Sequence, residues 1–294
     1  MSIRVGKIWR FLLGCCLALC CTGCESLLAR LSGDSQEFQS KRESKGSYRR
    51  APVGVAARYA LGSQSLNHTG LRILLDPGHG GEDLGAIGPD GLVEKDIVLD
   101  VAFKLEPLLK RNLGAEVFMT RRTDRALTLA ERAAMANDYE ADLFISLHVN
   151  ASQRKRAYGL EVYYLDNTDD SSSIKLAKRE NNTVSAGRLP GDLEFMLSDL
   201  IQNAKLDDSI VLAHSIGRAI YGRVAPNWRG IKYLGVKKAP FYVLVGVHMP
   251  CVLVEMFFVD HPRDAAKLAR ADFRQELAYG LYLGIQDYLR RRDS

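Results

Sequence analysis

The sequence predicts an α/β fold in which a layered, mostly parallel twisted sheet is flanked by helices. Short apolar segments alternate with longer segments whose apolar residues recur at helical spacing, and this alternation is typical of parallel sheets. The chain has 294 residues, of which 47% are hydrophobic and 26% charged, so it can bury one sizeable core. We therefore expect a single domain over residues 71–292, with a helical insertion.

The expected elements follow from periodicity and from turn residues. Strands are expected at residues 72–76, 115–120, 142–148, 159–165, 241–245 and 251–257. Helices are expected at residues 94–111, 129–137, 207–221 and 273–288. Pro107 lies within the first of these helices and should kink or shorten it, because proline lacks a backbone N–H.

Residues 166–206 interrupt this alternation. The segment contains a polar run, a candidate helix at 174–181, a loop with Pro190 and Gly191, and an apolar stretch at 193–201. An insertion of this length in a compact domain is usually a lid, a regulatory flap or a disordered segment. We expect it to act as a lid or regulatory insertion.

The first 24 residues have the pattern of a secretion signal. Arg4, Lys7 and Arg10 precede an apolar core at residues 11–21. The sequence CTGC then resembles a lipoprotein processing site in which Cys24 would be acylated, although Cys21 stands where leucine is usual. An anchored and an unanchored secreted protein both fit, and location in the periplasm or cell envelope is expected. A cytoplasmic role is the alternative.

Residues 25–70 are polar and mixed in charge, which is typical of a flexible tether. Basic residues within 41–50 could also favour an anionic membrane surface. The net charge of the chain is only +5, and no basic stripe with interleaved aromatic residues occurs, so no nucleic-acid partner is expected. Beyond Cys24 the only cysteine is Cys251, so a metal site must use nitrogen and oxygen ligands.

Four polar residues are expected at one edge of the sheet. His79 follows the first expected strand within a glycine-rich loop, His148 ends the third, and Glu255 lies near the end of the last. The carboxyl ends of strands in open α/β sheets line the binding crevice. Glu94 begins a helix and reaches the same edge if the glycine-rich loop folds back. Two histidines and a glutamate, with a second glutamate free, are the components of a catalytic zinc site.

Each of these residues also has a simpler interpretation. His79 could be an ordinary loop residue, Glu94 could stabilise a helix N-terminus, and His148 could be a buried, hydrogen-bonded histidine. Glu255 is harder to explain in this way, because it lies in the apolar run CVLVEMFFV. A buried, unpaired carboxylate is costly, so it needs a cation, a hydrogen-bond donor or a proton.

Six separated motifs occur in the order found in one known family: LLDPGHGGEDLGAIG, GLVEKD, MTRRTDRALTLAERAAMAN, SLHVNA, RGIKYLGVKKAPFYVL and MPCVLVEMFFV. Over residues 71–289 the chain resembles the zinc-dependent N-acetylmuramoyl-L-alanine amidases, which include enzymes of daughter-cell separation. Leu84 stands where that family often has proline.

The resemblance implies a role for each candidate residue. His79, Glu94 and His148 would bind Zn²⁺, and Glu255 would be the catalytic acid and base. Asn150 would position the substrate or a ligand. The implied substrate is peptidoglycan, cleaved between N-acetylmuramic acid and L-alanine during cell-wall remodelling or cell division.

The resemblance also implies a role for the insertion. Some periplasmic members of the family carry a helix there that covers the zinc and is displaced by an activator protein. The segment IKLAKRENN resembles that helix, so Glu180 would occupy the open zinc position at rest, or it is simply a solvated helix residue. Two other functions stay open at this point: a zinc peptidase acting on another cell-wall amide, and a peptidoglycan-binding protein with little turnover.

Overall fold

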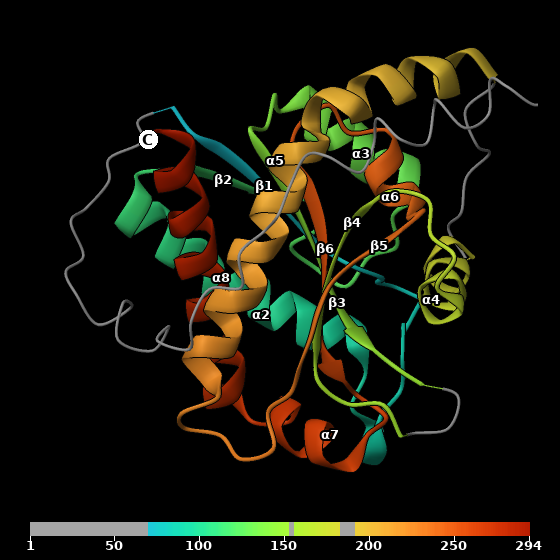
Figure 1. Cartoon of the computed structure of the whole chain (residues 1–294). Helices are drawn as coiled ribbons and strands as arrows, with labels where there is room; N and C mark the ends of the chain where they lie inside the picture. Colours follow the sequence, from blue (N-terminus) through green and yellow to red (C-terminus); the bar gives the residue numbers. More distant parts are fainter. Residues whose placement is uncertain (1–69, 153–155, 183–191) are drawn as a thin grey trace, which may run out of the picture. The chain divides into compact units, whose positions relative to one another are not determined.

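The computed structural model describes residues 70–152, 156–182 and 192–294, with the backbone alone over 192–204 (Figure 1). The expected signal peptide, with Cys24, and all but the last residue of the expected tether lie outside the described residues, as does the loop at 183–191. None of the described helices combines the length and the apolarity that a membrane crossing requires.

The described strands form one six-stranded mixed sheet in the order β2-β1-β3-β6-β4-β5. The strands are β1 (Arg72–Pro77), β2 (Glu116–Met119), β3 (Leu143–Asn150), β4 (Leu160–Leu165), β5 (Tyr233–Ala239) and β6 (Cys251–Phe258). All neighbouring pairs are parallel except β4 with β6. The start of β4 therefore lies at the same edge as the ends of β1, β3 and β6.

The described helices pack on both faces of this sheet (Figure 1). They are α2 (Glu94–Leu113), α3 (Leu129–Asp138), α4 (Ser171–Asn181), α5 (Asp192–Val224), α6 (Tyr242–Val245), α7 (Pro262–Leu268) and α8 (Ala271–Arg292), with a 3-10 turn, η2, at Pro89–Gly91. Helices α2, α5 and α8 enclose the larger hydrophobic core with one face of the sheet. Helices α3, α4 and α6 enclose a smaller core with the other face.

Alternation along the strands decides which face receives each side chain, because successive strand residues point to opposite sides. Leu74, Phe144 and Leu253 belong to the smaller core. His148 lies four residues beyond Phe144 and Glu255 two beyond Leu253, so both project toward the same face. The functional candidates on β3 and β6 are thus directed toward the side that carries α4.

Helix α2 continues through Pro107 to Leu113, so the expected shortening does not occur. Leu105, Leu109 and Leu113 are fully buried in the larger core, and their packing outweighs the loss of one backbone hydrogen bond. The helix ends at Gly114, whose φ of 67° is the left-handed conformation that glycine adopts readily. Helix α3 begins with a capping box between Thr128 and Glu131.

Besides the short elements η2 and α7, which were not among the expected helices, three elements differ from the sequence-based expectation. The segment expected as a strand at 241–245 contains the short helix α6, since an apolar run of this length does not separate helix from strand. Strand β5 was not expected, because YLGVKKA contains glycine and adjacent lysines without apolar alternation. The apolar stretch at 193–201 and the helix at 207–221 form one continuous helix, α5.

Candidate metal centre

The loop between β1 and η2 positions His79 through tight turns, and glycine occupies several of the positions where the turns need it. His79 itself has φ of 59°, and Gly80 and Gly81 also have positive φ. A Cβ atom at Gly78 would lie 2.4 Å from Cε1 of His148, and one at Gly85 would lie 2.6 Å from Cδ2 of His79. These glycines leave the space that the two imidazoles fill.

Glu94 is the first residue of α2, and the glycine-rich loop does fold back onto it. The Glu94 backbone N–H donates to Ala86 O at 2.9 Å, and Ala86 N–H donates to Glu94 Oε2 at 2.8 Å. Val149 N–H donates to Glu94 Oε1 at 2.9 Å. Burial raises the pKa of Glu94. Attraction to His79 and a hydrogen bond with His148 lower this pKa by more than burial raises it, so the group is a carboxylate.

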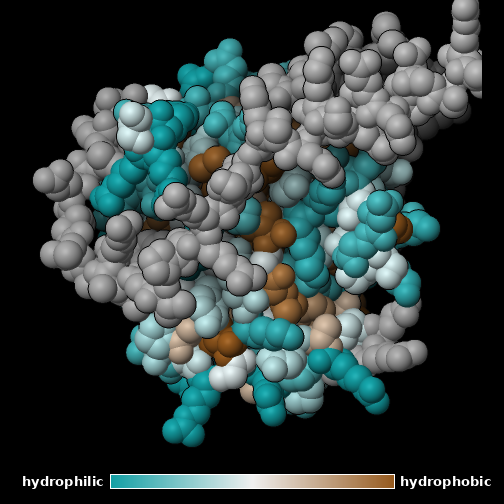
Figure 2. All heavy atoms as spheres, viewed as in Figure 1, coloured by the Kyte–Doolittle hydropathy of each residue, from teal (hydrophilic) through white to brown (hydrophobic). Residues whose placement is uncertain are grey.

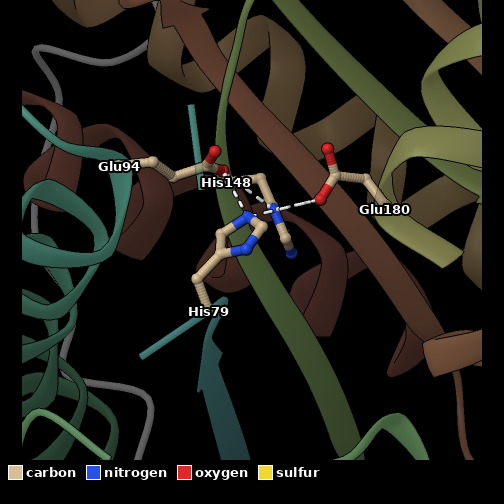
Figure 3. Close-up of side chains that lie close together, drawn as sticks. All are labelled: His79, Glu94, His148 and Glu180. Carbon is tan, nitrogen blue, oxygen red and sulfur yellow. Dashed lines mark hydrogen bonds and ion pairs between the residues drawn. The ribbon is translucent and has the colours of Figure 1, made fainter. Parts of the chain in front are cut away.

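The side chains of two histidines and two glutamates, His79, Glu94, His148 and Glu180, meet at one point (Figure 3). His79 Nε2 lies 3.2 Å and His148 Nδ1 lies 2.9 Å from Glu94 Oε1. Glu180 Oε2 lies 3.3 Å from each of the same two nitrogens. The four ligand atoms all lie within 4.8 Å of one another, and all four residues are buried. Imidazole nitrogens and carboxylate oxygens at such distances can hold a zinc-like cation.

The electrostatics of the cluster favour a positive charge at its centre. Burial alone would lower the pKa of His148, but the charges of Glu180 and Glu94 raise it to about 9. His79 Nε2 and Glu180 Oε2 are buried without hydrogen-bond partners, although they face each other across the cluster. A divalent cation would satisfy both atoms and both carboxylates at once.

Glu255 lies beside this cluster without belonging to it. Its side chain is 0% exposed, and neither carboxyl oxygen has a hydrogen-bond partner. Among the described residues it forms an ion pair with Arg179, whose Nη2 lies 3.9 Å from Glu255 Oε1. Burial raises the pKa of Glu255, and repulsion from Glu180 raises it further. A carboxyl group with a raised pKa is suited to take up a proton and to pass it on.

A profile of N-acetylmuramoyl-L-alanine amidases matches residues 73–287, which include the whole cluster and Glu255. The chain belongs to the N-acetylmuramoyl-L-alanine amidase family.

Curated relatives carry the same name. AmiA of Escherichia coli strain K12 is 33% identical over 225 residues, which are 76% of this chain and 77% of AmiA. AmiC of Neisseria meningitidis serogroup B is 36% identical over 223 residues, which are 74% of this chain but only 52% of AmiC. This chain therefore matches about half the length of that relative.

The fold is shared with solved amidase structures. The structure of AmiC2 of Nostoc punctiforme aligns with 76% of this chain and 99% of its own, with a TM-score of 0.57 and 29% identity. An amidase of Clostridium difficile 630 aligns with a TM-score of 0.58 and 26% identity over 75% of this chain and 97% of its own. The predicted family, α/β fold class and amidase class are confirmed.

In this amidase, Glu180 reaches the cluster from the last turns of α4. Leu176 and Ala177 of the same helix are buried in the smaller core. Glu180 is itself 4% exposed, which excludes the alternative of a solvated residue. Arg179 Nε donates to Glu180 Oε1 at 2.7 Å, and Arg179 Nη1 donates to Ala151 O at 2.8 Å. Arg179 and Glu180 are thus both directed into the site.

Asn150 lies at the end of β3 but makes its contacts away from the cluster of candidate metal ligands. Its Nδ2 donates to Glu161 Oε2 at 3.0 Å, and its Oδ1 accepts from Ala151 N–H at 2.8 Å. Glu161 is buried on β4 and directly opposes Glu255 in the antiparallel pair of β4 and β6. Sequence reasoning missed Glu161, although it is the one charged residue in the apolar strand LEVYYL.

A second missed residue, Asp83, orients His79. Asp83 Oδ2 lies 3.0 Å from His79 Nδ1, and Asp83 Oδ1 accepts from Gly85 N–H at 3.2 Å. A carboxylate at Nδ1 favours the tautomer with its proton there, which leaves Nε2 free to bind a metal. The signal available in the sequence was an acidic residue four positions after the histidine in the same loop.

Buried arginines hold the backbone that carries His79. Arg132 Nη2 donates to His79 O at 2.8 Å, and Arg121 Nη2 donates to Gly78 O at 2.8 Å. Arg132 Nη1 also donates to Asp76 Oδ1 at 2.7 Å, and the two groups form a buried ion pair. The loop conformation therefore depends on these long-range contacts as well as on its glycines.

Proposed function

We propose that this protein is a zinc-dependent amidase of peptidoglycan that hydrolyses the amide between the lactyl group of N-acetylmuramic acid and L-alanine. The observation that carries this proposal is the buried cluster of His79, Glu94 and His148 beside a carboxyl group, Glu255, whose oxygens accept no hydrogen bond from the described residues. Family membership supports the choice of amide. A cell-wall function in remodelling or daughter-cell separation follows from that substrate.

His79 Nε2, Glu94 and His148 Nδ1 would hold the zinc ion, which when bound acidifies water and polarises the scissile carbonyl. Glu255 accepts a proton from the attacking water and delivers it to the nitrogen of the leaving amine. The C–N bond breaks as a C–O bond forms, and the products are the muramoyl carboxylate and the free N-terminus of the peptide. Asp83 keeps His79 in the tautomer that leaves Nε2 available.

Glu180 is proposed to hold the same centre in a resting state. Its Oε2 lies 3.3 Å from both histidine nitrogens, and its position on the buried side of α4 would block access for a substrate carbonyl. Displacement of α4 by an activator protein would open the position. Figure 2 shows mostly hydrophilic residues on the visible surface of α4, which is the side that already faces water. Displacement would expose the buried side chains of Leu176 and Ala177.

Digestion of purified sacculi tests the amidase proposal. We expect stem peptides that begin with L-alanine to be released from intact glycan, release to stop with a chelator, and zinc to restore it. The Glu180→Ala chain should be assayed in parallel, since the resting state would limit the unaltered protein. Cleavage within the stem peptide would support the peptidase alternative. Binding to sacculi without release by either chain would support the binding protein.

Secretion to the periplasm or cell envelope is part of the same proposal, because the substrate lies there. Residues 1–24 would direct export, and acylation of Cys24 would anchor the protein to a membrane. Mass spectrometry of the mature N-terminus from the cell envelope tests both steps. An acylated N-terminal Cys24 supports the anchor, and an unprocessed Met1 contradicts the export signal.

A further inference from the structure

A cavity of about 750 Å³ lies beside the proposed catalytic carboxyl group and is not used by the mechanism above. Its walls are formed by β4, β5, the ends of β3 and β6, the inner side of α4, and the described part of the loop between β3 and β4, which contributes Arg156. Glu161, Tyr163 and Lys237 line it from the strands, and Lys175 and Arg179 line it from the helix. We call this space the β4–β5 cavity.

The β4–β5 cavity continues the line of the site across the sheet. His148 on β3 is paired with Glu255 on β6, and Glu255 is paired with Glu161 on β4. Lys237 on β5 then contacts Glu161 by an ion pair. Across the sheet, the cluster of candidate metal ligands therefore comes first, the proposed catalytic carboxyl group second and the cavity third. Asn150, the predicted positioning residue, lines the cavity as well.

The cavity is positively charged. Four cations line it, namely Arg156, Lys175, Arg179 and Lys237, against one carboxylate, Glu161. Lys237 neutralises Glu161, which also accepts hydrogen bonds from Asn150 Nδ2 and Tyr163 OH.

This positive charge does not depend on α4. Lys175 and Arg179 belong to α4, and Arg179 pairs with Glu180 of the same helix. Without them, Arg156 and Lys237 still face the single carboxylate of Glu161, and Arg156 forms no ion pair with any residue that the structure describes. A cavity of this charge is complementary to an anionic group, and an arginine binds a carboxylate through paired hydrogen bonds.

We propose that the β4–β5 cavity binds the stem peptide of the substrate and that a free carboxylate of this peptide is held by Arg156, with the Lys237 ammonium group shared between this carboxylate and Glu161. This inference rests on the proposed amidase function. Glu255 must deliver its proton to the leaving nitrogen, so the peptide attached to that nitrogen starts at Glu255. The cavity is the space that adjoins Glu255 on the same face of the sheet, whereas the cluster of candidate metal ligands lies on the other side of Glu255. Neither Arg156 nor Lys237 belongs to α4, so both stay in place when α4 is displaced.

Kinetics with two matched substrates test the subsite. The substrates are soluble N-acetylmuramoyl peptides with either free carboxylates or carboxamides along the stem, and the enzyme is the full chain carrying Glu180→Ala. We expect Arg156→Gln and Lys237→Gln each to lower kcat/KM about tenfold for the carboxylate substrate, the loss typical of one charge-assisted hydrogen bond. Hydrolysis of the carboxamide substrate should change much less.

Lys238→Gln is the matched control. Lys238 is the next residue on β5, so it points to the other side of the strand, where it pairs with Asp166 outside the cavity. It should leave both substrates unaffected. Lys237→Gln also removes the partner of Glu161 and could disturb the fold, so Arg156→Gln, which breaks no ion pair among the described residues, decides the outcome.

Equal losses on both substrates, or no loss in Arg156→Gln, would overturn the subsite while leaving the amidase function intact. Calorimetry with the free stem peptide separates the two proposals. If no chain hydrolyses either substrate, the proposed function fails. Weaker binding of the carboxylate peptide to Arg156→Gln than to the Lys238→Gln control would still support the cavity.

Discussion

His148 and Glu255 lie directly opposite each other on the neighbouring parallel strands β3 and β6. Their side chains project from the same face of the sheet. His148 belongs to the cluster of candidate metal ligands, and Glu255 lies outside it. A ligand and an acid–base group are thereby held in register by sheet hydrogen bonds rather than by a mobile loop. This rigidity gives Glu255 a fixed position next to any water or carbonyl bound at the cluster.

Replacing Glu255 by glutamine should abolish hydrolysis without removing the metal. The amide cannot accept or deliver the proton, and general acid–base catalysis contributes about 10²- to 10⁴-fold to a rate. Stem-peptide release in the Glu180→Ala background measures the activity, and elemental analysis measures the zinc content. A parallel loss of zinc would instead place Glu255 among the ligands.

Glu180→Ala should raise the basal rate of stem-peptide release in the absence of any activator. The substitution removes the fourth group from the cluster but leaves His79, Glu94 and His148 to hold zinc. Lys178→Ala is the matched control, because Lys178 lies on the exposed side of the same helix. An unchanged basal rate in Glu180→Ala, with zinc retained, would contradict self-inhibition.

Much of the site was predictable because parallel strands bring their carboxyl ends to one edge. His79, His148 and Glu255 each follow or end a recognisable apolar segment, and the structure places them side by side. Glu94 was predictable from the glycine content of the loop that precedes it. This convergence follows from the shared direction of the strands, whatever their order in the sheet.

The contacts that depend on strand order and direction were not predictable. Glu161 faces Glu255 only because β4 runs antiparallel to β6, and Lys237 reaches Glu161 only because β5 joins the edge of the sheet. Neither fact leaves a pattern in the local sequence. Similarly, no local signal shows that Arg132 bonds to the carbonyl of His79, from which it is separated by 53 residues.

Asp83→Asn should weaken zinc binding about 10- to 100-fold, the usual effect of removing a carboxylate that orients a metal-binding histidine. The asparagine cannot stabilise the Nδ1–H tautomer of His79 as the carboxylate does. Competition with a chromophoric chelator measures the affinity independently of activity. Glu82→Gln, an exposed neighbour in the same loop, is the control and should bind zinc normally. Equal affinities in the two variants would exclude an orienting role for Asp83.

The buried ion pair of Asp76 and Arg132 should make the stability of the fold depend on acid pH. Burial raises the pKa of Asp76, but attraction to Arg132, together with hydrogen bonds from Arg132 and Thr120, lowers it below the ordinary value of 3.8. A carboxyl group whose pKa is lower in the folded state stabilises the fold above pH 3.8, and this contribution is lost as the pH falls through the folded-state pKa.

Asp76→Asn tests this dependence. Removing one partner leaves Arg132 buried and uncompensated, so the free energy of unfolding at pH 7 should fall by about 3–5 kcal/mol. Urea unfolding of both metal-free chains over a series of pH values measures the difference. The difference in free energy of unfolding between the unaltered chain and Asp76→Asn should be constant near neutral pH and should narrow below the ordinary pKa of Asp76.

A second variant separates the ion pair from the other hydrogen bonds of Asp76. Because the side chain of Asp76 also accepts from Thr120 and Ser146, Ser146→Ala should lower the stability less than Asp76→Asn does. A difference between the unaltered chain and Asp76→Asn that stays unchanged down to the acid unfolding transition would show that Asp76 is not the group responsible.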